Sequence, residues 1–225
     1  MDTRSFVRLA LAVSFVVPMA IAAQPTEAVA YGESIAFEVD PNVLLLSQAE
    51  TNLNDGKPHA AALNAVKVFP KIKTAKADGN PLLSRAQRIV AMAVVRTDGM
   101  LTAGKEFDAS TADDRRANLE WAVSTLRRLN VAKKNNPSLE TDLGEALARL
   151  PETQSEALTT LDKLARKDLV TSARGYQALA QLRKASGDDE GCDAAMKKYE
   201  ALAKKGQPAS PAAKPAGSRN GVFST

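Results

Sequence analysis

The sequence predicts an all-α fold, and three observations lead to this prediction. Aromatic residues make up only 4% of the 225 residues, while alanine is abundant, and this composition suits closely packed helices better than a β-sandwich. An Asn or Asp directly precedes a proline at positions 40, 80 and 136, where the first side chain can cap a helix and the proline takes its first turn. No segment between turn signals alternates apolar and polar residues with the period of two that a half-buried strand needs.

Start and stop signals then divide the chain into elements. Helix starts lie at Asp40, Asn80 and Asn136, and turn-forming clusters that include Gly56, Gly99 and Gly187 mark helix ends. The apolar run 89–95 could also suit a strand, but its place after a helix start favours helix. These signals predict eight helices in four hairpins, over residues 41–54, 58–69, 81–97, 112–130, 137–149, 152–167, 170–185 and 189–204.

Residues 1–30 have the pattern of a secretory signal peptide. Arg4 and Arg8 precede an uncharged apolar stretch over residues 9–23, which is shorter than the roughly 20 residues that a spanning helix needs. Small residues at spacing two allow cleavage after Ala22 or after Ala30, and we favour the second site. We therefore expect a periplasmic or secreted protein without a transmembrane span after cleavage; the alternative is an uncleaved membrane anchor.

The remaining chain divides into a helical domain over residues 31–205 and a tail over 206–225. The tail is rich in Pro, Ala and Ser and poor in bulky apolar residues, so we expect it to be disordered. Cys192 is the only cysteine, and an exported chain with one cysteine has no internal disulfide. The stability of the domain must then come from helix packing.

The net charge of the chain gives no sign of nucleic-acid binding. The formal charge is +4, but the two arginines of the leader balance two acids there, and Lys214 and Arg219 of the tail contribute +2. The helical domain therefore keeps about +2, too little for the basic surface of a nucleic-acid-binding domain.

The last hairpin resembles a tetratricopeptide repeat. Leu179 and Ala180 follow Tyr176 at the W-x2-L-G spacing of that family, and Cys192, Met196 and Tyr199 follow the A-x3-F-x2-A spacing. Arg183 stands where the family has a tyrosine. Leu143, Gly144 and Leu147 supply the L-G-x2-Y element of the third hairpin, and similar small-large rows occur in the other second helices, at Ala61, Ala65 and Val68, at Ala117, Trp121 and Ser124, and at Ala157, Leu161 and Leu164.

This resemblance implies a right-handed stack of about four antiparallel helix hairpins, with a concave surface of first helices that binds a protein or peptide. The first helices of hairpins one and two lack the family's aromatic and glycine positions, and the starts are unevenly spaced, so an irregular helical bundle is the alternative. Carried onto the best-matched hairpins, the groove-facing positions are Arg174, Gln177, Gln181, Lys184, Thr141, Glu145 and Arg149.

Motifs for catalysis, cofactors and metals are weak. Residues 99–105 fit G-x4-G-K, but Glu106 stands where a P-loop needs Ser or Thr for Mg²⁺. His59 is the only histidine, in the first turn of a predicted helix. The acids at 113–114 and 188–190 lie at helix starts, where they satisfy backbone N–H groups. Lys71, Lys73 and Lys76 form the densest basic patch, which could contact anionic lipid or polysaccharide.

From these patterns we expect a non-catalytic scaffold that binds a protein or peptide partner, without a cofactor or a metal and without nucleic acid. Two alternatives stay open. The chain could be a structural subunit of an envelope complex, with self-association into a homo-oligomer, or a hydrolase whose carboxylate site has no recognisable motif.

Overall fold

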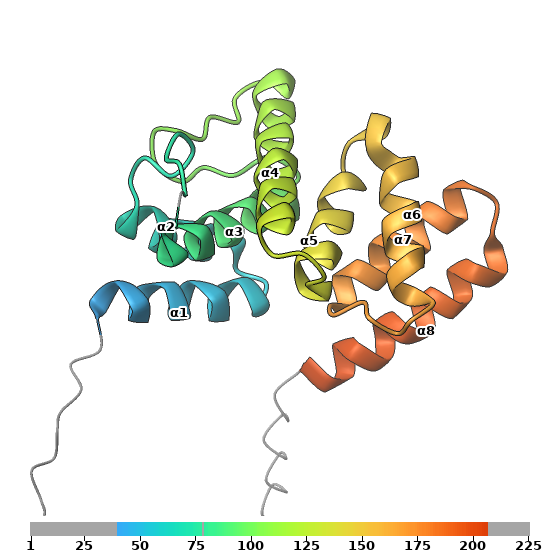
Figure 1. The fold of residues 1–225 in the computed structure, drawn as a ribbon. Helices are drawn as coiled ribbons and strands as arrows, with labels where there is room; N and C mark the ends of the chain where they lie inside the picture. Colours follow the sequence, from blue (N-terminus) through green and yellow to red (C-terminus); the bar gives the residue numbers. More distant parts are fainter. Residues whose placement is uncertain (1–39, 78, 207–225) are drawn as a thin grey trace, which may run out of the picture. The chain divides into compact units, whose positions relative to one another are not determined.

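The computed structural model describes residues 40–77 and 79–206, and within these residues it contains helices and no strand (Figure 1). Eight α-helices and one short 3₁₀ turn, η1, follow one another along the chain. Their bounds are α1 Pro41–Asn54, α2 Pro58–Val68, α3 Pro81–Arg96, α4 Ala112–Ala132, α5 Pro137–Leu147, η1 Pro151–Thr153, α6 Gln154–Ala165, α7 Ala173–Ala185 and α8 Asp189–Gly206. The predicted all-α class is confirmed, and each predicted helix has a counterpart.

Polar caps begin the helices where the sequence predicts them. The Asp40 carboxylate accepts from the amide of Asn42, the Asn80 side chain accepts from the amide of Leu83, and Asn136 accepts from two amides of α5. Residues 170–172 were predicted to be helical but precede α7, because the Ser172 hydroxyl accepts from the Gly175 amide and starts the helix there.

Consecutive helices pack against each other, and the first helices of neighbouring hairpins also touch. Contacts join α1 with α3, α3 with α5 and α5 with α7, besides each helix with the next. Small residues allow two of these approaches. A Cβ on Gly144 would lie 2.6 Å from the Leu161 side chain of α6, and one on Gly175 would lie 2.6 Å from the Thr141 side chain.

The core is densest around α3 and α5. Every residue from Ile89 to Val95 is buried, and so is every residue from Thr141 to Leu147. A helix buried on all sides has neighbours on all sides. These two helices are therefore central, and any polar side chain on them must find a partner inside the protein.

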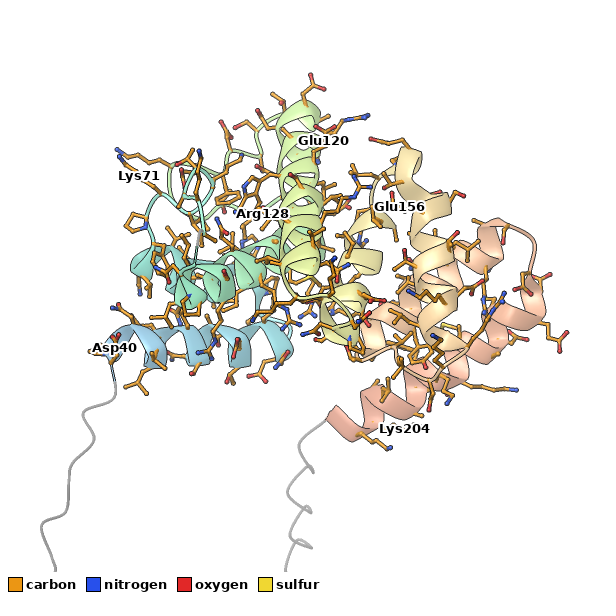
Figure 2. The ribbon with its side chains drawn as sticks, in the orientation of Figure 1. Asp40, Lys71, Glu120, Arg128, Glu156 and Lys204 are labelled. Atoms are coloured by element: carbon orange, nitrogen blue, oxygen red, sulfur yellow. The ribbon has the colours of Figure 1, made fainter. Side chains whose placement is uncertain are left out.

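The long connection between α3 and α4 packs on the segment after α2. Lys73 donates through its ammonium group to the Asn118 side chain at 2.9 Å, and its amide donates to the Glu106 carboxylate at 2.9 Å. Trp121 donates to the Lys73 carbonyl and meets Phe107 edge to face. The Lys73 ammonium therefore points inward and does not belong to a basic surface patch, whereas Lys71 is exposed (Figure 2).

Two predictions lie outside the described residues, namely the signal peptide over 1–30 and the disordered tail over 206–225, apart from Gly206, which ends α8. Among the helices that the structure describes, none combines the length and the apolar character that crossing a membrane requires.

Candidate functional site

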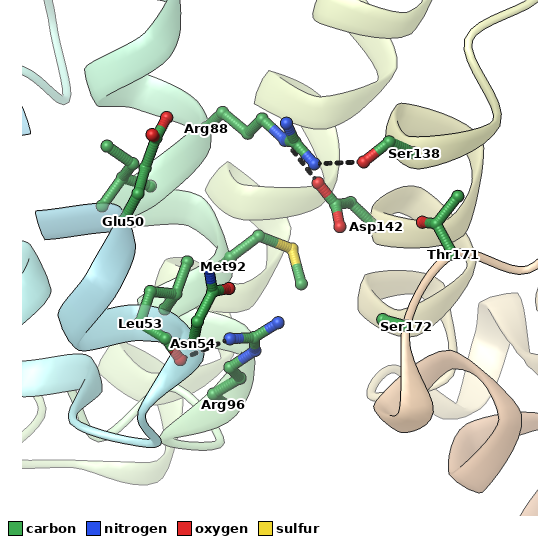
Figure 3. A pocket seen from close by; sticks show the side chains of 11 residues that line it. Glu50, Leu53, Asn54, Arg88, Met92, Arg96, Ser138, Asp142, Thr171 and Ser172 are labelled. Atoms are coloured by element: carbon green, nitrogen blue, oxygen red, sulfur yellow. Dashed lines mark hydrogen bonds and ion pairs between the residues drawn. The ribbon is translucent and has the colours of Figure 1, made fainter. Parts of the chain in front are cut away.

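A polar pocket of about 350 Å³ opens on the first helices of the hairpins (Figure 3). Residues of α1, α3, α5 and the segment before α7 line it. They are Glu50, Leu53, Asn54, Arg88, Ile89, Met92, Arg96, Ser138, Asp142, Thr171 and Ser172. The pocket is therefore built from parts of the chain that lie more than 100 residues apart in sequence.

Helix α3 brings three arginines to one face. Arg85, Arg88, Met92 and Arg96 follow one another at spacings of three or four residues, which places them on one stripe of an α-helix. The opposite faces of α3 carry apolar residues and are buried. The register of the apolar residues thus directs the arginines of α3 toward α1 and α5.

Two of these arginines form well-made ion pairs. Arg85 binds both carboxylate oxygens of Glu50 on α1, at 2.7 and 2.6 Å. Arg88 donates to the Asp142 carboxylate and to the Ser138 hydroxyl on α5, both at 2.6 Å (Figure 3). Such short charge-assisted hydrogen bonds hold the guanidinium groups in place.

The third arginine has a buried but poorly made pair. Arg96 donates to the Leu53 carbonyl of α1 at 2.7 Å, while its Nε lies 3.5 Å from a Glu145 oxygen of α5 without a hydrogen bond. The Glu145 side chain is only 2% exposed. Within residues 40–77 and 79–206, neither of its carboxylate oxygens has a hydrogen-bond partner.

Burial shifts the pKa values of two acids on α5, Asp142 and Glu145. Loss of solvation raises the pKa of the Glu145 carboxyl; the charge of Arg96 opposes this rise and that of Asp142 adds to it. Burial also raises the pKa of the Asp142 carboxyl, against the attraction of Arg88. Acids of this kind are a sign of a functional site when they border a pocket.

The seven residues predicted to face the groove differ in how exposed they are. Arg174 and Gln177 are half-buried on α7, and Gln181 and Lys184 are exposed there. Arg149 is exposed and lines a second pocket, of about 270 Å³, beside Arg115 and Arg116 at the start of α4.

Thr141 and Glu145 are buried, in contrast to the open groove position that the resemblance implied. Thr141 faces the start of α7, where its methyl group lies against Gly175 and its hydroxyl accepts from the Thr171 amide. The same hydroxyl donates to the Pro137 carbonyl of its own helix. Glu145 faces α3, because it lies one turn from Asp142 on the stripe that meets Arg88 and Arg96.

Glu50, Arg88, Arg96 and Asp142 line the pocket but are not among the predicted site residues. A signal was present, since the α3 arginines share one face of the helix, and Ser138, Asp142 and Glu145 share one face of α5. Only the packing of α3 against α5 shows that these two stripes meet.

Two acidic residues of the weak motifs accept hydrogen bonds at helix starts. Thr111 and Asp114 form a reciprocal capping box at the start of α4, and the Asp188 carboxylate accepts from the Gly191 amide. His59 is exposed in the first turn of α2. In the part of the chain that the structure describes, no group of three or more His, Cys, Asp or Glu side chains is arranged to hold a metal ion.

Comparisons of this chain with protein-family models, with curated protein sequences and with solved structures found no match.

Proposed function

We propose that this chain is a non-catalytic binding protein of the periplasm or the secreted space, and that its pocket on α1, α3 and α5 binds a segment of a partner protein. The observation that carries the proposal is the pocket itself. It crosses three consecutive first helices and is lined mainly by polar side chains held in place by ion pairs.

The packing of the helices supports a tetratricopeptide-like stack. In such a stack each first helix contacts the first helix of the next hairpin, and the described helices have these contacts from α1 to α7. A surface made of successive first helices suits an extended peptide, because each helix adds side chains along its path.

The chemistry of the lining also suits a peptide. Arginine, serine, threonine and asparagine side chains offer donors for peptide carbonyls and for acidic side chains, while Leu53, Ile89 and Met92 offer apolar surface. A site of this kind, partly apolar with a few fixed polar groups, is typical of ligand pockets.

The test is a crosslinking pull-down with the full tagged chain from the envelope fraction of its own host, because the partner is unidentified. Arg88→Gln is the site variant, since it removes the positively charged guanidinium but leaves an uncharged polar side chain. Arg127→Gln is the matched control: Arg127 is exposed on α4 and pairs with Glu156, away from the pocket lining. Circular dichroism confirms that each variant folds.

We expect one partner that the wild type and Arg127→Gln capture and that Arg88→Gln loses. Equal capture by all three baits would overturn the assignment of the pocket as the binding site. Recovery of this chain alone would replace the proposal with the self-associating structural subunit.

A further inference from the structure

The strongest unexplained feature of the molecule is the buried Glu145 carboxylate beside the pocket. Three ion pairs join arginines of α3 to carboxylates of α1 and α5 near this place. Glu50 and Asp142 accept well-made hydrogen bonds from Arg85 and Arg88. Glu145 accepts none from the described residues, although it is almost fully buried, and an unpaired buried carboxylate is costly.

The pocket also presents donors that nothing in the described chain uses. Arg88 donates through Nε and Nη2, and Arg96 donates through Nη1. Neither Arg88 Nη1 nor Arg96 Nη2 makes a hydrogen bond to residues 40–77 or 79–206. Both side chains line the pocket, and two guanidinium groups on one pocket are a typical binding site for a carboxylate.

The acids beside the pocket limit what can enter. A carboxylate bound by Arg88 and Arg96 would lie close to Asp142 and Glu145, and its repulsion from these two ionised groups would carry an electrostatic cost. One proton on Glu145 would remove the repulsion from the more deeply buried of the two.

Glu145 is the carboxylate best placed to take that proton. Arg96 of α3 and Arg174 of α7 face it from the neighbouring helices, and Asp142 and Arg149 act on it from its own helix. The Arg96 pair is the only one of the three that lacks a hydrogen bond. Protonating Glu145 therefore breaks no hydrogen bond within the described residues, whereas protonating Glu50 or Asp142 would weaken a short one.

We propose that the pocket binds an aspartate or glutamate side chain of the partner segment together with one proton, which resides on Glu145. The proton comes from solvent and forms an O–H bond on the Glu145 carboxyl, so the bound state gains one negative and one positive charge. This inference rests on the proposed function and names the group that the site recognises.

A linked proton makes the affinity depend on pH. An anion next to Arg96 raises the pKa of the Glu145 carboxyl further above the value that burial already gives it. Affinity is highest below the pKa of the free protein, falls by up to about tenfold per pH unit between the free and bound pKa values, and is constant above the bound value.

The experiment uses the full chain and three acetylated tetrapeptides, each measured by calorimetry at several pH values in buffers of different ionisation enthalpy. One peptide is amidated and contains a single glutamate. The second has glutamine at that place, and the third has a free C-terminus and no acidic side chain. We expect the glutamate peptide to bind with uptake of up to one proton, and more tightly than the other two.

Two variants separate the linkage from a structural role. Glu145→Gln is a neutral side chain of the same shape, so it should bind the glutamate peptide at neutral pH as tightly as the wild type does at low pH, with no proton uptake. Arg88→Gln should lose at least tenfold in affinity, and Arg127→Gln should match the wild type.

This inference would be overturned if the wild type bound the glutamate peptide without proton uptake, or if it bound the glutamate and glutamine peptides with equal affinity. Binding restricted to the free C-terminus would overturn its assignment to an acidic side chain. If the glutamate and glutamine peptides bind with equal affinity and Arg88→Gln weakens that binding, the proposed peptide-binding function still stands. A failed pull-down would overturn that function separately.

Discussion

At the scale of single residues, ionic groups on α3 and α5 differ in how well they are paired. Arg88 and Asp142 form a short hydrogen-bonded pair, whereas Arg96 and Glu145 share a buried place without a hydrogen bond. The gain from an ion pair depends on its geometry, while the loss of hydration does not. The two pairs should therefore respond differently to a change of charge.

Wild-type stability should rise as the pH is lowered from 7.5 toward 5. The pKa values of Asp142 and Glu145 are raised in the folded protein above their ordinary values of 3.8 and 4.5. The folded state therefore binds more protons than the unfolded state, and the free energy of unfolding falls as pH rises through the folded pKa. Urea unfolding at several pH values measures this, and a stability that falls steadily on acidification from 7.5 would contradict it.

Glu145→Gln should raise the free energy of unfolding at pH 7.5 by about 1 kcal/mol and flatten its pH dependence. The substitution removes a buried charge whose ion pair with Arg96 is too poorly aligned to offset the loss of hydration. Arg96 keeps its hydrogen bond to the Leu53 carbonyl. Urea unfolding of variant and wild type at pH 7.5 measures the change. A loss of stability would show that the pair is better made than its geometry indicates.

At the scale of elements, helix ends and close helix contacts follow from a few small or polar residues. At the start of α4, the side chains of Thr111 and Asp114 each accept a hydrogen bond from the backbone amide of the other residue. Gly144 lets α5 approach α6 until no Cβ fits between them. Each of these features can be removed by one substitution.

Gly144→Ala should destabilise the protein by about 1 to 3 kcal/mol, although alanine favours helix over glycine. Its Cβ would lie 2.6 Å from the Leu161 side chain, which is fully buried. Thermal and urea unfolding measure the loss. The double variant with Leu161→Ala should lose less than the sum of the two single variants, and strict additivity would mean that the two residues do not compete for this space.

Thr111→Ala should lower the free energy of unfolding by about 1 kcal/mol. The substitution removes the hydroxyl that accepts a hydrogen bond from the Asp114 amide at 3.0 Å. The Asp114 carboxylate would also lose the Thr111 hydroxyl as a donor. Thr102→Ala, at an exposed loop position, is the control and should be near neutral. Equal midpoints in urea for the two variants would argue against a stabilising capping box.

At the scale of the whole molecule, stability is concentrated in the central helices. All residues from Ile89 to Val95 of α3 are buried, whereas α8 contributes the buried Ala195 and several half-buried side chains. Regions with few buried contacts open at lower cost than the core does.

Amide hydrogen exchange should therefore be slowest in α3 and α5 and faster in α8. The exchange of residues 89–95 should approach the rate set by global unfolding, and that of 197–205 should be faster by orders of magnitude. Mass spectrometry on peptic fragments resolves these helices, and uniform protection along the chain would contradict the expectation.

The helices of this protein can be predicted from the sequence, because their signals are local. Caps at Asp40, Asn80 and Asn136 and the glycine turns act within a few residues, so the predicted and observed bounds agree to within three residues. The site could not be predicted in this way. The sequence patterns assigned no function to the arginines of α3 and predicted that Thr141 and Glu145 face an open groove, because a single helix does not show what packs on it. That the polar stripes of α3 and α5 meet is visible only in the folded protein, because contacts over some 50 residues depend on how the apolar faces of several helices fit together.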